Sequence, residues 1–212
     1  ISNSNTTGTK PNPQSLDPDN RLYWHANRKR LDAEELRDTV LTISGSLDAR
    51  IGGSVIHDAT AVDSNDSKAA NIEYGYRFID TRRSLYTPAF RNVRHPLFEV
   101  FDFADINAPV GRRSTSTVAT QELFLLNHPF VIEHARIAAT KLLAQAGVSD
   151  ESRIGKLYDA ALGRPPSAGE MKHALSYVDS PESGNASPDE IRDVWARLLQ
   201  ALIASPDFRF LD

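Results

Sequence analysis

Cysteine is absent from this chain of 212 residues. The absence excludes disulfides, zinc or iron–sulfur sites built on cysteine, covalently attached haem and a cysteine nucleophile within these residues. It does not report the cellular compartment, because cysteine-free domains occur in reducing and oxidising surroundings alike. We therefore expect no cofactor in this portion of the protein.

Long apolar runs and an excess of positive charge are also missing. No segment approaches the ~18 apolar residues of a membrane-spanning helix, and no charged and then apolar signal peptide opens the chain. Lys and Arg total 24 against 28 Asp and Glu, a formal net charge of −4, whereas nucleic-acid binding needs a clustered excess of Lys and Arg. The sequence predicts neither membrane insertion nor nucleic-acid binding as a function.

The composition that is present, 40% hydrophobic and 25% charged, is typical of one soluble domain with its own apolar core. The first residue is Ile1 rather than Met, so we expect the chain to be a piece of a longer protein. Residues 1–20 are rich in Ser, Asn, Thr and Pro, which predicts a disordered or surface-draped arm. Residues 21–212 then form a single mainly helical domain, in which residues 149–212 are a helical sub-bundle.

Apolar residues at helical spacing, bounded by capping residues, predict most of the secondary structure. Ser187 followed by Pro188 and two acids, for example, is the start of a helix whose apolar face carries Leu199 and Ile203. The predicted helices span residues 21–31, 33–47, 95–103, 120–127, 128–145, 153–162, 167–178 and 187–203.

Two further segments complete the prediction of the fold. Short aromatic runs at residues 74–79 and 84–90, joined through residues 80–83, predict a β-hairpin. Residues 48–71 are rich in Gly, Ser, Asp and Asn and predict a long loop. The fold class is therefore mainly α: a bundle-like domain of about seven helices with one β-hairpin and long irregular loops.

The common catalytic signatures are missing. There is no HExxH, GxSxG, Walker A or GxGxxG motif. His57–Asp58 resembles a metal-phosphohydrolase dyad but lies in a loop and has no partner motif. The oxygen-bearing run at residues 63–67 resembles a calcium loop, yet Lys68 and Tyr74 occupy the positions that need Gly and Glu. We therefore predict no metal site.

Arginines are concentrated in the middle of the chain, with seven between Arg77 and Arg113. Guanidinium groups bind sulfate, phosphate or carboxylate in pairs, so convergence of these segments would create an anion site. The same groups would equally serve as internal partners for loops that lack regular hydrogen bonding, and we favour this structural role. The candidate residues for either role are Arg82, Arg83, Arg91, Arg112, Arg113, Asp102, Asp105, Gln121 and Asn127.

Four phrases, in order and at consistent spacing, resemble the planctomycete-type domain of unknown function fifteen fifty-three. They lie at residues 17–48, 82–92, 101–135 and 157–171, and include YWHANRKRLDAEELRD, RRSLYTPAFRN, FDFADINAPVGRRSTS and LYDAALGRPPSAGEM. The resemblance implies that the chain is the C-terminal portion of a larger family domain. It also implies an exported parent, periplasmic or at the cell surface, which often carries a planctomycete cytochrome c domain and hence haem elsewhere. It implies no established activity.

Three functional hypotheses remain open. We favour a non-catalytic binding or scaffold domain of an exported, haem-associated multidomain protein, whose partners are other domains of the same polypeptide. The alternative is an enzyme or enzyme subunit that acts on anionic or sulfated carbohydrate through the arginine-rich region. A third hypothesis is an electron-transfer partner that docks against the haem domain of the parent.

Overall fold

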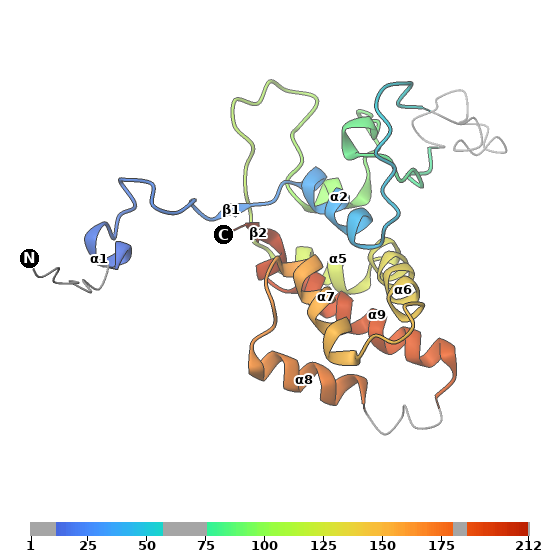
Figure 1. Ribbon diagram of the computed structural model, residues 1–212. Helices are drawn as coiled ribbons and strands as arrows, with labels where there is room; N and C mark the ends of the chain where they lie inside the picture. Colours follow the sequence, from blue (N-terminus) through green and yellow to red (C-terminus); the bar gives the residue numbers. More distant parts are fainter. Residues whose placement is uncertain (1–11, 57–75, 180–185, 212) are drawn as a thin grey trace, which may run out of the picture.

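Helices dominate the structure (Figure 1), a computed structural model that describes residues 12–56, 76–179 and 186–211. The described residues contain eight α-helices, so the prediction of a mainly α fold is confirmed. In chain order these helices are α1 (Pro13–Leu16), α2 (Ala33–Ile43), α4 (Pro96–Val100), α5 (Ala119–Asn127), α6 (Pro129–Leu143), α7 (Asp150–Leu162), α8 (Ala168–Val178) and α9 (Pro188–Ala204).

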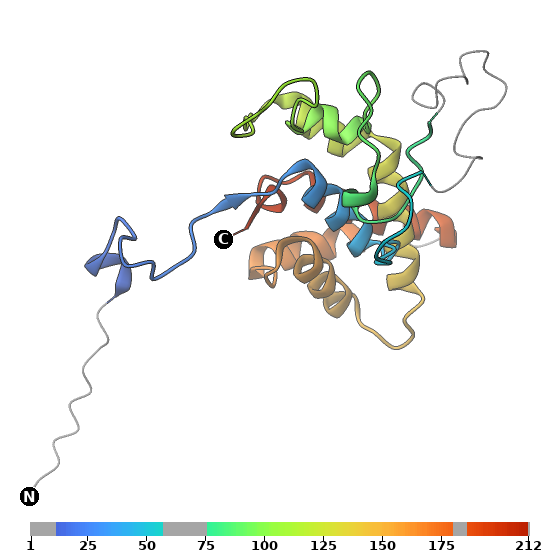
Figure 2. The same cartoon turned by 90° about the horizontal axis from the view of Figure 1, so that it is seen from above.

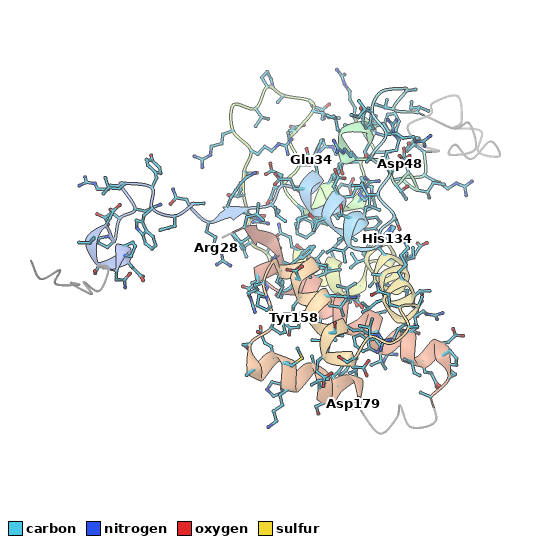
Figure 3. All side chains as sticks on the ribbon, viewed as in Figure 1. Arg28, Glu34, Asp48, His134, Tyr158 and Asp179 are labelled. Carbon is cyan, nitrogen blue, oxygen red and sulfur yellow. The ribbon has the colours of Figure 1, made fainter. Side chains whose placement is uncertain are left out.

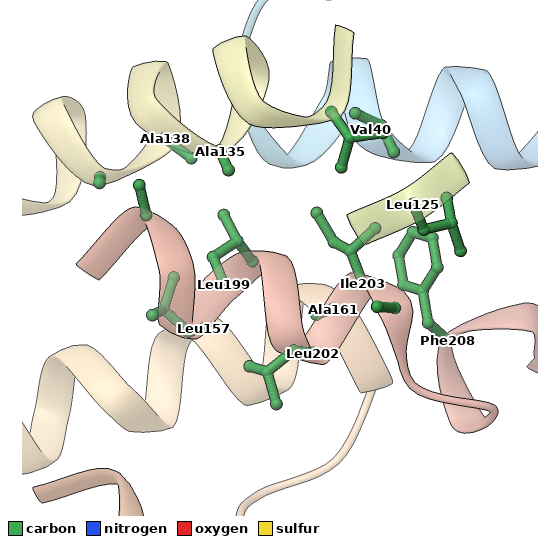
Figure 4. Close-up of a cluster of buried hydrophobic side chains, with 14 of the residues drawn as sticks. Val40, Leu125, Ala135, Ala138, Leu157, Ala161, Leu199, Leu202, Ile203 and Phe208 are labelled. Carbon is green, nitrogen blue, oxygen red and sulfur yellow. The ribbon is translucent and has the colours of Figure 1, made fainter. Parts of the chain in front are cut away.

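Helix α9 lies at the centre of the core, between α6 on one side and α7 on the other (Figure 4). Its residues Leu199 and Ile203 are almost completely buried, as are Ala135 on α6 and Ile154 on α7. The small alanines of α6 let the two helix backbones approach closely, which favours tight packing. The apolar stripe predicted for residues 187–203 is therefore the main contact face of the core.

A second layer, formed by α2, α4 and the loops around them, covers the other side of α6 (Figure 2). Leu36 and Val40 of α2 are buried against Leu97 and Phe98 of α4. The pattern of apolar residues predicted both helices, although α4 ends earlier than the predicted residue 103. This layer carries most of the candidate arginines.

The predicted helix starts and stops are present as specific hydrogen bonds. Ser187 and Glu190 cap α9 reciprocally, and Ser167 and Glu170 do the same for α8. Gly163 ends α7 with φ of +64°, a conformation that costs a glycine little. Local signals therefore bounded α8 and α9 closely, but the predicted start of α7 at residue 153 is wrong, because Ser149 caps the helix and α7 begins at Asp150.

The prediction of one antiparallel pair of strands is confirmed, but its predicted position is wrong. The pair joins β1 (Lys29–Arg30) to β2 (Phe210–Leu211), so that the C-terminal strand lies beside the segment that precedes α2. Residues Ser84–Tyr86 instead form a 3-10 helix. The reason is that the backbone N–H and the hydroxyl of Ser84 both donate to the Asp38 carboxylate, at 2.8 and 2.7 Å, and are not available to a partner strand.

The helix predicted over residues 21–31 is also wrong. Asn20 and Tyr23 adopt left-handed backbone conformations, with φ of +52° and +53°, which a right-handed helix does not allow. Residues 12–28 instead form an extended arm, which holds α1 and projects from the body in both views (Figures 1 and 2). Within the described ranges, no helix has both the length and the apolar character needed to cross a membrane.

Candidate functional site

Arg82 joins several segments of the second layer, the one formed by α2, α4 and the loops around them. Its buried guanidinium donates to three backbone carbonyls, those of Arg50 (3.1 Å), Gly52 (2.5 Å) and Ser54 (3.3 Å). It also stacks on the ring of Tyr86, 3.8 Å from the centroid. The Tyr86 hydroxyl accepts a hydrogen bond from the backbone N–H of Gly52 at 2.7 Å. Arg82 therefore fastens residues 48–56 to the 3-10 helix.

Arg37, which sequence reasoning did not select, supports the same region from α2. It is fully buried and donates to the carbonyl of Arg82 at 2.7 Å, to the carbonyl of Asp80, and to the hydroxyl of Ser84 at 3.3 Å. Burial lowers the pKa of Arg37, whereas the nearby Asp38 carboxylate opposes this effect. The signal in the sequence was an arginine three positions before the apolar Val40, on the buried face of α2.

A second cluster joins Arg30 to the loop before α5. Arg30 donates to the side-chain oxygen of Gln121 at 2.8 Å and to the carbonyl of Ser116. The Asp102 carboxylate accepts from the backbone N–H and the hydroxyl of Ser116, both at 2.7 Å. Gln121 is fully buried and donates to the carbonyl of Val100 at 3.1 Å. The candidates Asp102 and Gln121 therefore lie together, with their polar atoms committed to holding this loop.

Arg113 forms a bidentate ion pair with Glu34 of α2, with nitrogen–oxygen distances of 2.7 and 2.8 Å. Its guanidinium also lies 5.3 Å from the centroid of the Phe103 ring. The hydrogen bonds to Glu34 raise the pKa of Arg113. This pair fastens the loop of residues 104–117 to α2 and leaves Arg113 no free fork for a bound anion.

The other candidate residues are dispersed. Arg83, Arg91 and Arg112 are exposed, and none of their side chains hydrogen-bonds or forms an ion pair within the part of the chain that the structure describes. Asp105 accepts from the backbone N–H of Asn107 at 2.9 Å and pairs with Arg94 at 3.5 Å. Asn127 donates to the carbonyl of Leu123 within α5. The candidate arginines therefore do not come together to form one anion site.

His95 and His128 are the N-cap residues of α4 and α6. His95 is buried among the rings of Phe78, Phe98 and Phe130. Burial lowers its pKa to about 3, with smaller contributions from Arg37 and His128. The ring nitrogen Nδ1 of His95 accepts from the backbone N–H of Leu97 at 3.2 Å. His95 is thus a neutral helix cap.

Among the described residues, no group of three His, Asp or Glu side chains is arranged to hold a metal ion. His57, Asp58 and the calcium-like run at residues 63–67 lie outside the described residues.

A groove with a volume of about 1120 Å³ lies between α2 and the C-terminal end of α7, and we call it the α2–α7 groove. Its apolar lining includes Leu31, Leu85, Phe98, Phe103, Phe208, Phe210 and Leu211, and its charged lining is Glu34, Glu35, Asp38, Asp159, Asp207 and Arg164. The segment after α9 completes one wall, because β2 is paired with β1. Figure 3 shows Glu34 on α2 and Arg28 at the foot of the arm.

Some of the carboxylates that line the α2–α7 groove are bound by basic side chains or backbone N–H groups, and one is not. Glu34 is bound to Arg113, and Glu35 accepts from Lys29 at 2.9 Å and from the backbone N–H of Asp32 at 2.8 Å. Burial acts to raise the pKa of Glu35, but these hydrogen bonds outweigh it and the pKa is lowered. Asp159 is exposed, and its carboxylate has no partner among the residues of known placement. Among the carboxylates that line the groove, Asp159 is therefore the one without a charged partner in the described part of the chain.

A family model described as Protein of unknown function (DUF1553) matches residues 3–178. No curated protein and no solved structure matches the chain.

Proposed function

Because the chain belongs to the family described as Protein of unknown function (DUF1553), we propose a role from its own geometry. The domain is a non-catalytic binding module, and its α2–α7 groove binds a polypeptide segment that combines apolar side chains with a positive charge. The observation that carries the proposal is the lining of the groove, aromatic and aliphatic residues beside the unpaired carboxylate of Asp159. Apolar clefts with a few polar groups are typical binding sites.

The carboxylates of the α2–α7 groove are poorly suited to acid–base catalysis. A general acid needs a raised pKa, and the pKa of Glu35 is lowered. Asp38 is committed to Ser84, and Glu34 to Arg113. The alternative function, an enzyme acting on anionic or sulfated carbohydrate, depended on converging arginines, and the engagement of Arg82 and Arg113 elsewhere removes its main support.

The proposal includes the setting that the resemblance implies. The domain works in an exported multidomain protein. Its partners are other domains of the same polypeptide, and the haem is bound by another domain of this parent protein. The lack of cysteine supports this division, since covalent haem attachment would require another domain. Fractionation of cells that produce the full-length protein, followed by haem staining, tests it, and a protein retained in the cytosol without haem would contradict it.

A single introduced cysteine can report on the groove, because the natural chain has none. Thr42 lines the groove and is exposed, so Thr42→Cys is labelled with an environment-sensitive fluorophore. The probes are short synthetic peptides of Arg, Leu and Tyr, the same peptides with Glu in place of Arg, and a sulfated oligosaccharide. We expect a saturable emission change with the first probe and a much weaker one with the other two.

The matched control is Lys172→Cys, an exposed position on α8 outside the groove, which should not respond to any probe. A response to the sulfated oligosaccharide with none to the peptides would overturn the proposed function and favour the carbohydrate alternative. Equal responses at positions 42 and 172 would show non-specific adsorption of the peptides and would also count against the groove as the site.

A further inference from the structure

The arm, residues 12–28, holds its shape through its own hydrogen bonds. The Asp17 carboxylate accepts from the backbone N–H groups of Arg21 at 2.9 Å and Leu22 at 2.7 Å. The indole N–H of Trp24 donates to the carbonyl of Asp17 at 2.9 Å. The Asn20 amide donates to the carbonyl of His25 at 2.9 Å. The arm is therefore a locally defined element and does not depend on the body for its conformation.

This conformation presents apolar side chains to solvent. Leu22 is 81% exposed, Tyr23 is 80% exposed and Leu16 is 68% exposed. Tyr23 also has a positive φ of 53°, which costs roughly 1 kcal/mol for a residue with a side chain. A cluster of exposed apolar groups held by a strained backbone indicates a contact surface.

The arm is directed away from its own groove. It leaves the body at β1, where Lys29 pairs with Leu211 and Arg30 with Phe210. Arg28 fixes the exit direction, since it lies 4.4 Å from the centroid of the Phe210 ring and pairs with Asp207 at 3.6 Å. Both views show the arm pointing outward from this place (Figures 1 and 2). Folding back at this point would break these contacts, so the exposed apolar side chains of the arm do not reach the groove of their own chain.

We propose that the arm binds in the α2–α7 groove of a second copy of this chain, so that two chains exchange arms. This inference rests on the proposed function, that the groove binds a polypeptide segment with apolar groups and a positive charge. The arm has that chemistry: Leu22 and Tyr23 are exposed beside Arg21. The guanidinium of Arg21 and the carboxylate of Asp159 both lack a partner among the described residues, and together they form an ion pair across the contact.

Reciprocal exchange explains why a second copy is the occupant. Donor and acceptor lie on the same chain, so each copy offers one arm and one groove. Two copies then use both, and the assembly closes with two-fold symmetry, as in exchange of an identical element between protomers. The foot of the arm continues into β1, which pairs with β2, and Phe210 and Leu211 of β2 line the groove. The donor and the acceptor of the contact are therefore neighbours on each chain.

Charge reversal tests the contact by sedimentation equilibrium of the whole chain. Arg21→Glu and Asp159→Arg should each weaken the dimer at least about ten-fold, because each places like charges together. The double variant R21E/D159R restores the opposite charges and should recover most of the loss. Glu133→Arg, an exposed position on α6 outside the groove, is the matched control and should leave the dimer unchanged.

The apolar part of the contact has its own test. Replacement of Leu22 and Tyr23 by Ser should abolish the dimer, while circular dichroism and urea unfolding of the variant remain as in the natural chain, because neither side chain is buried in the body. The same double replacement at two other exposed apolar residues, Leu126 and Tyr177, is the control.

The remaining outcomes separate a failure of arm exchange from a failure of the proposed function. A chain that stays monomeric up to millimolar concentration overturns arm exchange. A dimer that is insensitive to both single charge reversals, or that the double variant does not recover, also overturns it. If the chain is monomeric but the label at position 42 still responds to the Arg, Leu and Tyr peptide, arm exchange alone fails and the proposed function stands. If the label is silent towards that peptide, the proposed function fails.

Discussion

Arg82 and Arg83 are neighbours in the sequence, but their side chains have opposite environments. Arg82 is 5% exposed and donates to the carbonyls of Arg50, Gly52 and Ser54, whereas Arg83 is exposed. A planar guanidinium can reach several acceptors at once, and the single ammonium of lysine cannot replace it. The contribution of each arginine to stability is therefore set by its acceptors rather than by its charge.

We predict that Arg82→Lys lowers the free energy of unfolding by about 1–3 kcal/mol, because buried carbonyls lose their donors. Arg83→Lys is the matched control and should change it by less than about 0.5 kcal/mol. Urea unfolding of both variants measures the difference. Equal stability of the two variants would contradict the role of Arg82 as a clamp of residues 48–56.

His95 makes stability depend on pH. Its pKa is lowered from 6.5 to about 3 in the folded state by burial. As the pH falls below 6.5, the unfolded chain takes up a proton that the folded chain refuses, so the free energy of unfolding decreases down to about pH 3. Burial also lowers the pKa values of His128 and His134, and their loss of stability has the same sign.

We predict that His95→Asn makes the stability less dependent on pH, by up to about 1 kcal/mol per pH unit between roughly pH 6 and pH 4. Asparagine keeps an acceptor for the backbone N–H of Leu97 and does not titrate. Urea unfolding of both proteins across this range gives the two slopes. If the slopes are the same, His95 is not the group responsible.

At the scale of elements, α9 depends on its N-cap as well as on its apolar face. The Ser187 hydroxyl accepts from the backbone N–H of Glu190 at 3.3 Å, and the Glu190 carboxylate accepts from the backbone N–H of Ser187 at 2.7 Å. This reciprocal cap satisfies donors that the first turn of the helix leaves unpaired. It also fixes the residue at which α9 begins, the helix whose apolar face carries Leu199 and Ile203.

We predict that Ser187→Ala lowers the free energy of unfolding by about 1 kcal/mol. Ser114→Ala, in an exposed loop position without a hydrogen bond in the described structure, is the control and should have almost no effect. Thermal unfolding of both variants checks the prediction. A loss of similar size in the two variants would mean that the serine itself, rather than the cap, is responsible.

Most helices were predictable because their signals are local. Ser167 with Glu170, Pro129, and Gly163 each act within one turn of the helix end that they define. The strand pair was not predictable at its true position, because Lys29 and Leu211 are joined across almost the whole chain and their side chains carry no pairing signal. The error in residues 84–90 has the same origin, a hydrogen bond from Ser84 to the distant Asp38.

The candidate site was predictable only in its residue types. Arg82 and Arg113, two of the arginines predicted as internal partners or anion ligands, bind groups of the chain itself, but the partner of Arg113 is Glu34, far away in the sequence. Arg37 was not among the candidate residues, although it is the largest fully buried side chain of the described residues, since a single arginine on an amphipathic helix usually lies in solvent. Spatial convergence is a property of the tertiary structure, and local patterns do not encode it.

At the scale of the whole molecule, the chain consists of a body and an arm. Side chains in the body are buried to different degrees, whereas most side chains of the arm are exposed. The α6–α9 contact is the most buried part, the α2 layer covers it, and the arm meets the body near β1 and Arg28. Local opening free energies follow burial, so these three parts should differ in their protection from hydrogen exchange.

We predict that, in dilute solution where the chain is monomeric, amides of α9 exchange most slowly, those of α2 faster and those of the arm fastest. Within the arm, the N–H groups of Arg21 and Leu22 should exchange more slowly than their neighbours, because both donate to Asp17. Native-state exchange read by NMR resolves each amide. At high concentration, arm exchange into the groove of a second copy should protect Leu22 and Tyr23, and should leave α9 unchanged because it is already buried. Protection of the arm that does not depend on concentration would instead show that it packs against its own body, in conflict with both the exposed Leu22 and the outward direction of the arm.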